Sequence, residues 1–149
     1  MSKAAFIEFF ERDLTALQNE ISSYSNEPNL WIVSGEISNC AGNLCLHLVG
    51  NLNHFIGGVL GKTRYVRDRD KEFSIKNTPR KELIAALEKT RHMVNHTLTH
   101  LSTDEYNSLY PIEFFGKNLM TDHMLLQLST HLNYHLGQVN YHRRLLDKK

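Results

Sequence analysis

The sequence has few cysteines and almost no excess of charge. Its 149 residues include two cysteines, and 17 basic residues stand against 16 acidic ones for a net charge of +1. Two cysteines are too few for a disulfide framework, so Cys40 and Cys45 are interpreted as small buried or half-buried thiols in a reducing compartment. Balanced charge argues against a broad surface for nucleic acid or anionic membrane, and neither is expected as a partner.

Uninterrupted hydrophobic runs are also lacking. The N-terminal "MSKAAFIEFFERDL" places acids among its apolar residues and does not resemble a signal peptide. Residues 37–61 carry no Asp, Glu, Lys or Arg and are long enough to span a bilayer. However, this segment contains six Asn and His side chains, which are costly to transfer into lipid: Asn39, Asn43, His47, Asn51, Asn53 and His54. We therefore predict a buried helix of a cytoplasmic protein rather than a membrane span.

Four segments show the apolar spacing of three and four residues that is typical of amphipathic helices. They cover about 3–24, 41–60, 79–101 and 121–146. Ser38 or Asn39, Thr78 and Thr121 are the predicted N-caps, and Pro79 suits a first helical position. This pattern predicts an all-α four-helix bundle in one domain, residues 1–149.

The two later connections are long. "GKTRYVRDRDKEFSIKN" (residues 61–77) is dense in charge and has no helical period, which indicates an ordered connection or crossover with a salt-bridged surface. "STDEYNSLYPIEFFGKN" (residues 102–118) is aromatic and can hold a short hairpin or irregular cover. The aromatic residues of 106–115 are candidates for an exposed dimer interface.

Eight of the nine histidines can be placed by the direction in which each faces on its predicted helix. Since each residue turns an α-helix by about 100°, His92, His96 and His100 fall on the side opposite their helix's apolar stripe and are predicted to face solvent. His131 and His135 lie at the edge of the inward face. His142 shares that face but lies about 10 Å further along the axis than His135, so it is interpreted as a neighbour or interface residue.

An inward histidine needs a hydrogen-bond partner or a metal ion. Histidines at i and i+4 can bind one ion from adjacent turns, and a third ligand must then come from another helix. His47 and His54, which flank the apolar stripe of 41–60, are the candidates, and spacing alone leaves the choice open.

Three segments in this order resemble the DinB-like superfamily, across essentially the whole chain: "NLCLHLVGNLNHF" (43–55), "RYVRDRDKEF" (64–73) and "HLNYHLGQVNYHRRLL" (131–146). More narrowly, the chain resembles a branch of small uncharacterised members. The resemblance implies an up-up-down-down bundle with a crossover, often dimeric, and a metal site of His47, His131 and His135. It leaves His54 as the second choice for the third ligand. The resemblance does not assign the identity of the metal, and nickel or zinc is ranked ahead of iron and manganese.

Characterised members of the superfamily include bacillithiol transferases and a mycothiol-dependent isomerase. The resemblance therefore implies a metal-dependent transferase acting on a small-molecule thiol and an electrophile. A metal-dependent hydrolase, or a non-catalytic metal-binding or sensing bundle, is the alternative. Asn51, Gln138, Arg67 and Arg69 are candidates to orient the ligands or the substrate. No residue stands out as a general base, and the catalytic residues stay unassigned.

Overall fold

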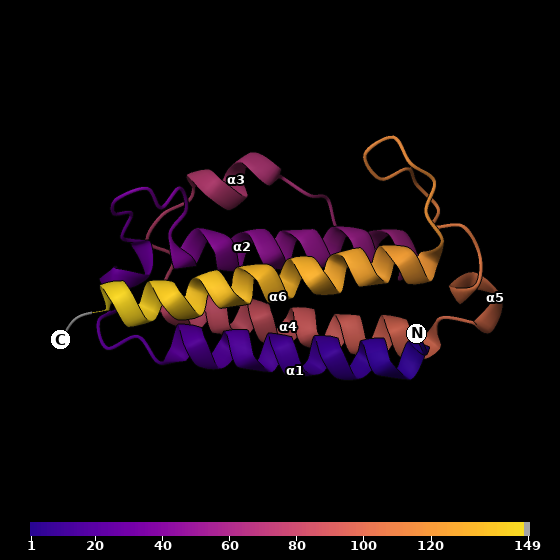
Figure 1. The fold of residues 1–149 in the computed structure, drawn as a ribbon, viewed down its shortest axis with the longest axis horizontal. Coiled ribbons are helices and arrows are strands. Elements are labelled where there is room, and N and C mark those ends of the chain that lie inside the picture. Colours follow the sequence, from indigo (N-terminus) through magenta and orange to yellow (C-terminus); the bar gives the residue numbers. More distant parts are fainter. Residues whose placement is uncertain (148–149) are drawn as a thin grey trace.

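The computed structural model describes residues 1–147 and contains no β-strand within them. Four long helical segments lie side by side: α1 (Lys3–Ser22), α2 (Ala41–Leu52) continued by the π-helix η2 (Asn53–Leu60), α4 (Arg80–His100) and α6 (Thr121–Leu146) (Figure 1). Three short elements occupy the connections: η1 (Glu27–Trp31), α3 (Arg69–Ser74) and α5 (Thr103–Tyr106). The predicted all-α bundle is confirmed. Within 1–147, no helix is long and apolar enough to cross a membrane.

The helix directions differ from the predicted up-up-down-down order. Lys3 at the start of α1 donates to the Leu101 carbonyl at the end of α4 (2.6 Å), so these helices are antiparallel. Arg143 and Glu20, near the ends of α6 and α1, pair at 2.7 Å, so those two are parallel. Figure 1 shows α2 running with α4, which gives the order up, down, down, up. The crossover falls in the charged connection of residues 61–77, where it was predicted. This connection returns along the outside of the bundle and makes α2 and α4 parallel.

The apolar stripes form the core as predicted, because each helix turns its stripe toward the bundle axis. On α1 all five stripe residues are at most 1 % exposed, and the stripe leucines of α2 and α4 are buried as well. The stripe residues of α1 are Phe6, Phe10, Leu14, Leu17 and Ile21. The predicted helix over 41–60 changes to π-helical winding after Leu52. Asn53 belongs to that change: its amide donates to the Val49 carbonyl and to Thr90 Oγ1, both at 2.8 Å.

The predicted N-caps lie one or two residues away from the observed ones. Cys40, Pro79 and Met120 occupy the cap positions, and none of them makes a capping hydrogen bond with its side chain. At α4 the exposed amide of Arg80 instead donates to Glu27 Oε1 at 2.8 Å. A carboxylate of η1, in the distant connection between α1 and α2, thus replaces the predicted local cap, and no local sequence pattern indicates this.

The charged connection contains a helix that its pattern does not predict. α3 is capped by Asp68, whose Oδ1 accepts from the Lys71 amide at 3.2 Å. Six residues are too few to show a helical period, so this short helix escapes a search for periodicity.

The later connection contains a small hairpin, as expected. Phe114 and Lys117 exchange two backbone hydrogen bonds of 2.9 and 3.1 Å around Phe115 and Gly116. The prediction that the aromatic residues of 106–115 form an exposed surface holds for Phe115 alone, which is 85 % exposed. Tyr110 is buried and donates to the Phe55 carbonyl at 2.6 Å.

Candidate metal centre

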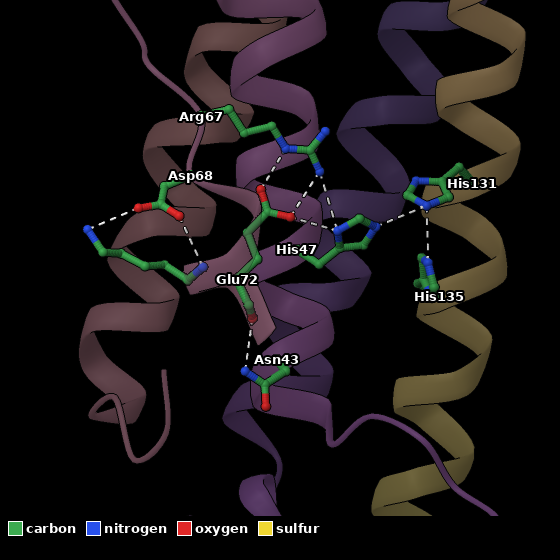
Figure 2. A network of polar contacts seen from close by, with 8 residues as sticks. Asn43, His47, Arg67, Asp68, Glu72, His131 and His135 are labelled. Atoms are coloured by element: carbon green, nitrogen blue, oxygen red, sulfur yellow. Dashed lines mark hydrogen bonds and ion pairs between the residues drawn. The ribbon is translucent and has the colours of Figure 1, made fainter. Parts of the chain in front are cut away.

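Three histidines from two helices meet at one point between α2 and α6 (Figure 2). His47 Nε2 lies 3.2 Å from His131 Nε2, which lies 3.1 Å from His135 Nε2. The three potential ligand atoms all lie within 4.8 Å of one another. His47 is 5 % exposed and the other two are half-buried. The structure therefore brings together the three residues predicted as metal ligands.

The tautomer of His47 is determined by Glu72, which lies on α3. Glu72 Oε2 accepts a hydrogen bond from His47 Nδ1 at 2.8 Å, so the lone pair of the neutral ring is on Nε2, the atom that faces the other histidines. Glu72 is 6 % exposed, and a buried carboxylate needs a partner charge. Arg67 supplies it through two hydrogen bonds, Nε to Oε1 at 2.6 Å and Nη2 to Oε2 at 2.9 Å.

The backbone places Glu72 in this position. Asn43 of α2 donates from its side-chain amide to the carbonyls of Glu72 (2.9 Å) and Ile75 (2.8 Å), which attaches α3 to α2. Gly50 of α2 leaves room for the carboxylate, since a Cβ there would lie 2.7 Å from Glu72 Cδ. Glu72 is not among the site residues predicted from the sequence. The segment "RDRDKEF" could have indicated it, because Glu72 lies there beside Arg67 and Arg69, which were predicted to orient ligands or substrate.

His135 is oriented in the same way by a local partner. Its Nδ1 lies 2.6 Å from Gln138 Oε1, so the ring donates to that amide oxygen and turns its Nε2 lone pair inward. Gln138, one of the residues predicted to orient ligands or substrate, thus contacts His135 directly. His131 Nδ1 is buried and has no hydrogen-bond partner among residues 1–147.

The cluster is electrically neutral at pH 7. Burial, together with the neighbouring His135 and His47, lowers the pKa of His131 to about 4. Burial also lowers the pKa of His135 and of His47, for which the Glu72 hydrogen bond acts in the opposite direction. Two Nε2 lone pairs therefore converge on a third imidazole that carries no charge of its own. The single N–H of a neutral His131 can satisfy at most one of these lone pairs, whereas a metal ion can be bound by all three rings, so the donor set fits a divalent ion that imidazole prefers.

Two cavities adjoin the histidines. The first cavity, of about 510 Å³, is lined by His47 and His131 together with Asn51, Arg67 and Arg69. The second cavity, of about 660 Å³, is lined by His135, Gln138, Tyr134, Tyr141 and Glu36. Three of the candidate orienting residues, Asn51, Arg67 and Arg69, thus share one cavity wall.

Five other histidines lie apart from the cluster, whereas His123 of α6 lines the first cavity together with His47 and His131. His54, the second choice for the third ligand, is half-buried and rests its ring against Phe55, with centroids 4.7 Å apart. His92, His96 and His100 are exposed, as predicted.

His142 is 3 % exposed and belongs to the core rather than to an interface. Its Nδ1 accepts from the Tyr24 hydroxyl at 2.7 Å and its Nε2 donates to the Ile32 carbonyl at 2.9 Å. These two hydrogen bonds use both ring nitrogens, which leaves none for the cluster.

The fold and the site define a class: an all-helical bundle in which two helices direct three histidines to one buried point. The chain belongs to the family described as "Protein of unknown function (DUF1572)", whose model matches residues 4–149. That family is part of the DinB-like superfamily. No curated protein matches the chain significantly.

Proposed function

We propose that the protein binds one divalent metal ion through the Nε2 atoms of His47, His131 and His135. The observation that carries the proposal is the convergence of three neutral imidazoles, two of which have Nδ1 engaged by Glu72 and Gln138. Imidazole ligands suit nickel and zinc, with iron and manganese as further candidates. Three histidines leave coordination positions free, as in catalytic sites, whereas structural zinc sites have four protein ligands.

The reaction that fits this site best is transfer of a small-molecule thiol to an electrophile. A bound divalent ion lowers the pKa of a thiol or a water molecule that it holds. The thiol sulfur would form the new bond to carbon, and the thiol proton would depart with the displaced group. Cavities on both sides of the histidines favour two organic substrates over one substrate and water. A hydrolase or a non-catalytic metal-binding or sensing bundle is the alternative function.

The metal assignment is tested by measuring metal per chain in tag-free protein and in single alanine variants of the three histidines. We expect near-stoichiometric metal in the native protein and a large loss in His47→Ala, His131→Ala and His135→Ala. His96→Ala is the matched control, because His96 belongs to a helical ladder of the same spacing that faces solvent. Unchanged metal content in His131→Ala and His135→Ala would disprove the assignment.

The reaction class is tested separately with the metal-loaded protein. Bacillithiol, mycothiol, glutathione and coenzyme A are each offered with a set of electrophiles, and thioether formation is followed by mass spectrometry. Turnover that disappears in His131→Ala supports transfer. Metal-dependent ester or amide hydrolysis without thioether formation would favour the hydrolase, and no turnover at all would favour the sensing bundle.

The setting proposed for this chemistry is a cytoplasmic homodimer. Cys40 and Cys45 are both free and buried, which suits a reducing compartment. The dimer is implied only by the superfamily resemblance, and light scattering on the purified chain tests it directly.

A further inference from the structure

The first cavity has an unusual charge composition for this chain. Arg67, Arg69 and Lys117 line it, and no Asp or Glu of residues 1–147 does so. The whole chain, by contrast, has nearly equal numbers of acidic and basic residues. The second cavity has the opposite balance, with Glu36 and no Lys or Arg among its described lining residues. Charge is therefore sorted between the two sides of the histidine cluster.

Of the three basic side chains that line the first cavity, two are not paired with an acidic side chain of residues 1–147. Arg67 is paired with Glu72 through two hydrogen bonds. Arg69 and Lys117 make no ion pair with any residue of 1–147, although basic side chains elsewhere, such as Arg91 and Arg143, are paired with acids. Positive charge that is left uncompensated in a concave site attracts and concentrates anions.

A buried acceptor and an aromatic wall complete the cavity. Asn51 is 7 % exposed, and its Oδ1 has no partner within the described chain, so it can accept from a donor on a bound molecule. Phe55, Phe114 and Phe115 form a row of edge-to-face contacts, with centroids 5.6 and 4.6 Å apart. The row begins at Phe55 of η2 and ends at Phe115 in the hairpin, two residues before Lys117.

We propose that the first cavity binds the anionic substrate of the protein, a small carboxylate-class molecule with an apolar or aromatic part. Arg69 and Lys117 hold the anionic group and the phenylalanine row contacts the apolar part. Asn51 Oδ1 can accept a further hydrogen bond from a ligand that carries a hydroxyl or amide donor, which benzoate lacks. The inference extends the proposed function by assigning one of its two substrates. Binding of the anion itself does not require the metal.

Benzoate and its neutral isostere benzamide are suitable probes, titrated into metal-free full-length protein and followed by amide chemical shifts. We expect saturable benzoate binding, with shifts near Asn51 and Phe115, and at least about tenfold weaker binding of benzamide. The double variant Arg69→Gln, Lys117→Gln should lower benzoate affinity by about tenfold or more while leaving benzamide unchanged.

The matched control is Arg64→Gln, Lys89→Gln, which removes two exposed positive charges outside the cavity and should retain native benzoate affinity. Equal affinity for the two probes would overturn the proposal. So would an equal loss in both double variants, or no binding of either probe. Metal analysis on the same preparations distinguishes the metal-site hypothesis from the anion-site hypothesis. If the protein prefers benzoate but binds no metal, only the metal-site hypothesis is disproved. If it binds metal but does not prefer benzoate over benzamide, only the anion-site hypothesis is disproved.

Discussion

Gly50 lies directly beneath the carboxylate of Glu72, which approaches so closely that any Cβ at position 50 would overlap its side chain. This contact joins α2 to α3 and allows Glu72 to reach His47. A glycine inside a helix costs about 1 kcal/mol relative to alanine, so its presence here has a structural reason.

We expect Gly50→Ala to destabilise the protein by about 1–3 kcal/mol despite the better helix propensity of alanine, because Glu72 must move out of a packed site. The measurement is the free energy of urea unfolding, together with metal content. Gly137→Ala, in open space on α6, is the matched control and should stabilise the protein by about 0.5–1 kcal/mol. A Gly50→Ala variant as stable as Gly137→Ala would contradict the packing account.

Replacing Glu72 with glutamine should weaken metal binding about 10- to 100-fold, as is typical when a partner of a metal-binding histidine is changed. The variant keeps the shape of the side chain but leaves the half-buried Arg67 without its counter-charge. Competition with a chelator gives the affinity, and Asp70→Asn on the exposed side of α3 is the control. Equal affinities in the two variants would show that His47 does not depend on Glu72.

The stability of the metal-free protein should fall as the pH decreases from about 6.5 toward 4. Burial lowers the pKa of His131 from 6.5 to about 4 in the folded chain, and the pKa values of His47 and His135 are lowered as well. Between the two pKa values the unfolded chain binds more protons than the folded one, so the free energy of unfolding rises with pH across that window. Above pH 6.5 these histidines add no further dependence.

Urea titrations at intervals from pH 4 to 8, with metal removed by a chelator, measure this slope. In His131→Gln the free energy of unfolding should depend less steeply on pH between 4 and 6.5. The difference between the two proteins separates the contribution of His131 from that of carboxylates, which titrate in the same pH range. Identical slopes would mean that His131 is not held neutral by burial.

The hairpin tip gives a further prediction, since Phe115 adopts the left-handed conformation with φ at 49°. Such a conformation costs a bulky residue of the order of 1 kcal/mol, whereas asparagine and glycine are favoured in two-residue hairpins of this kind. Phe115→Asn should therefore stabilise the protein by up to about 1 kcal/mol and weaken benzoate binding. Phe115→Ala removes the same aromatic contact but retains most of the backbone cost, so it should weaken benzoate without stabilising. A loss of stability in Phe115→Asn would contradict this interpretation.

Much of the helical architecture follows from the sequence, because its causes are local. The stripe from Phe6 to Ile21 and the outward position of His96 depend only on the turn of about 100° per residue. The same rule places His131 and His135 on adjacent turns facing inward. Helix ends were less predictable, since Glu27 replaces a local cap at Arg80 from 53 residues away.

The sequence by itself determined an all-helical chain with an inward histidine pair on its last helix, and the DinB-like resemblance selected His47 as the third member. Only the tertiary structure decided the up-down-down-up order, the role of Glu72 and the sorting of charge between two cavities. The physical reason is separation along the chain. His47 meets Glu72 across 25 residues and His131 across 84, and contacts of that range depend on how the crossover returns along the bundle.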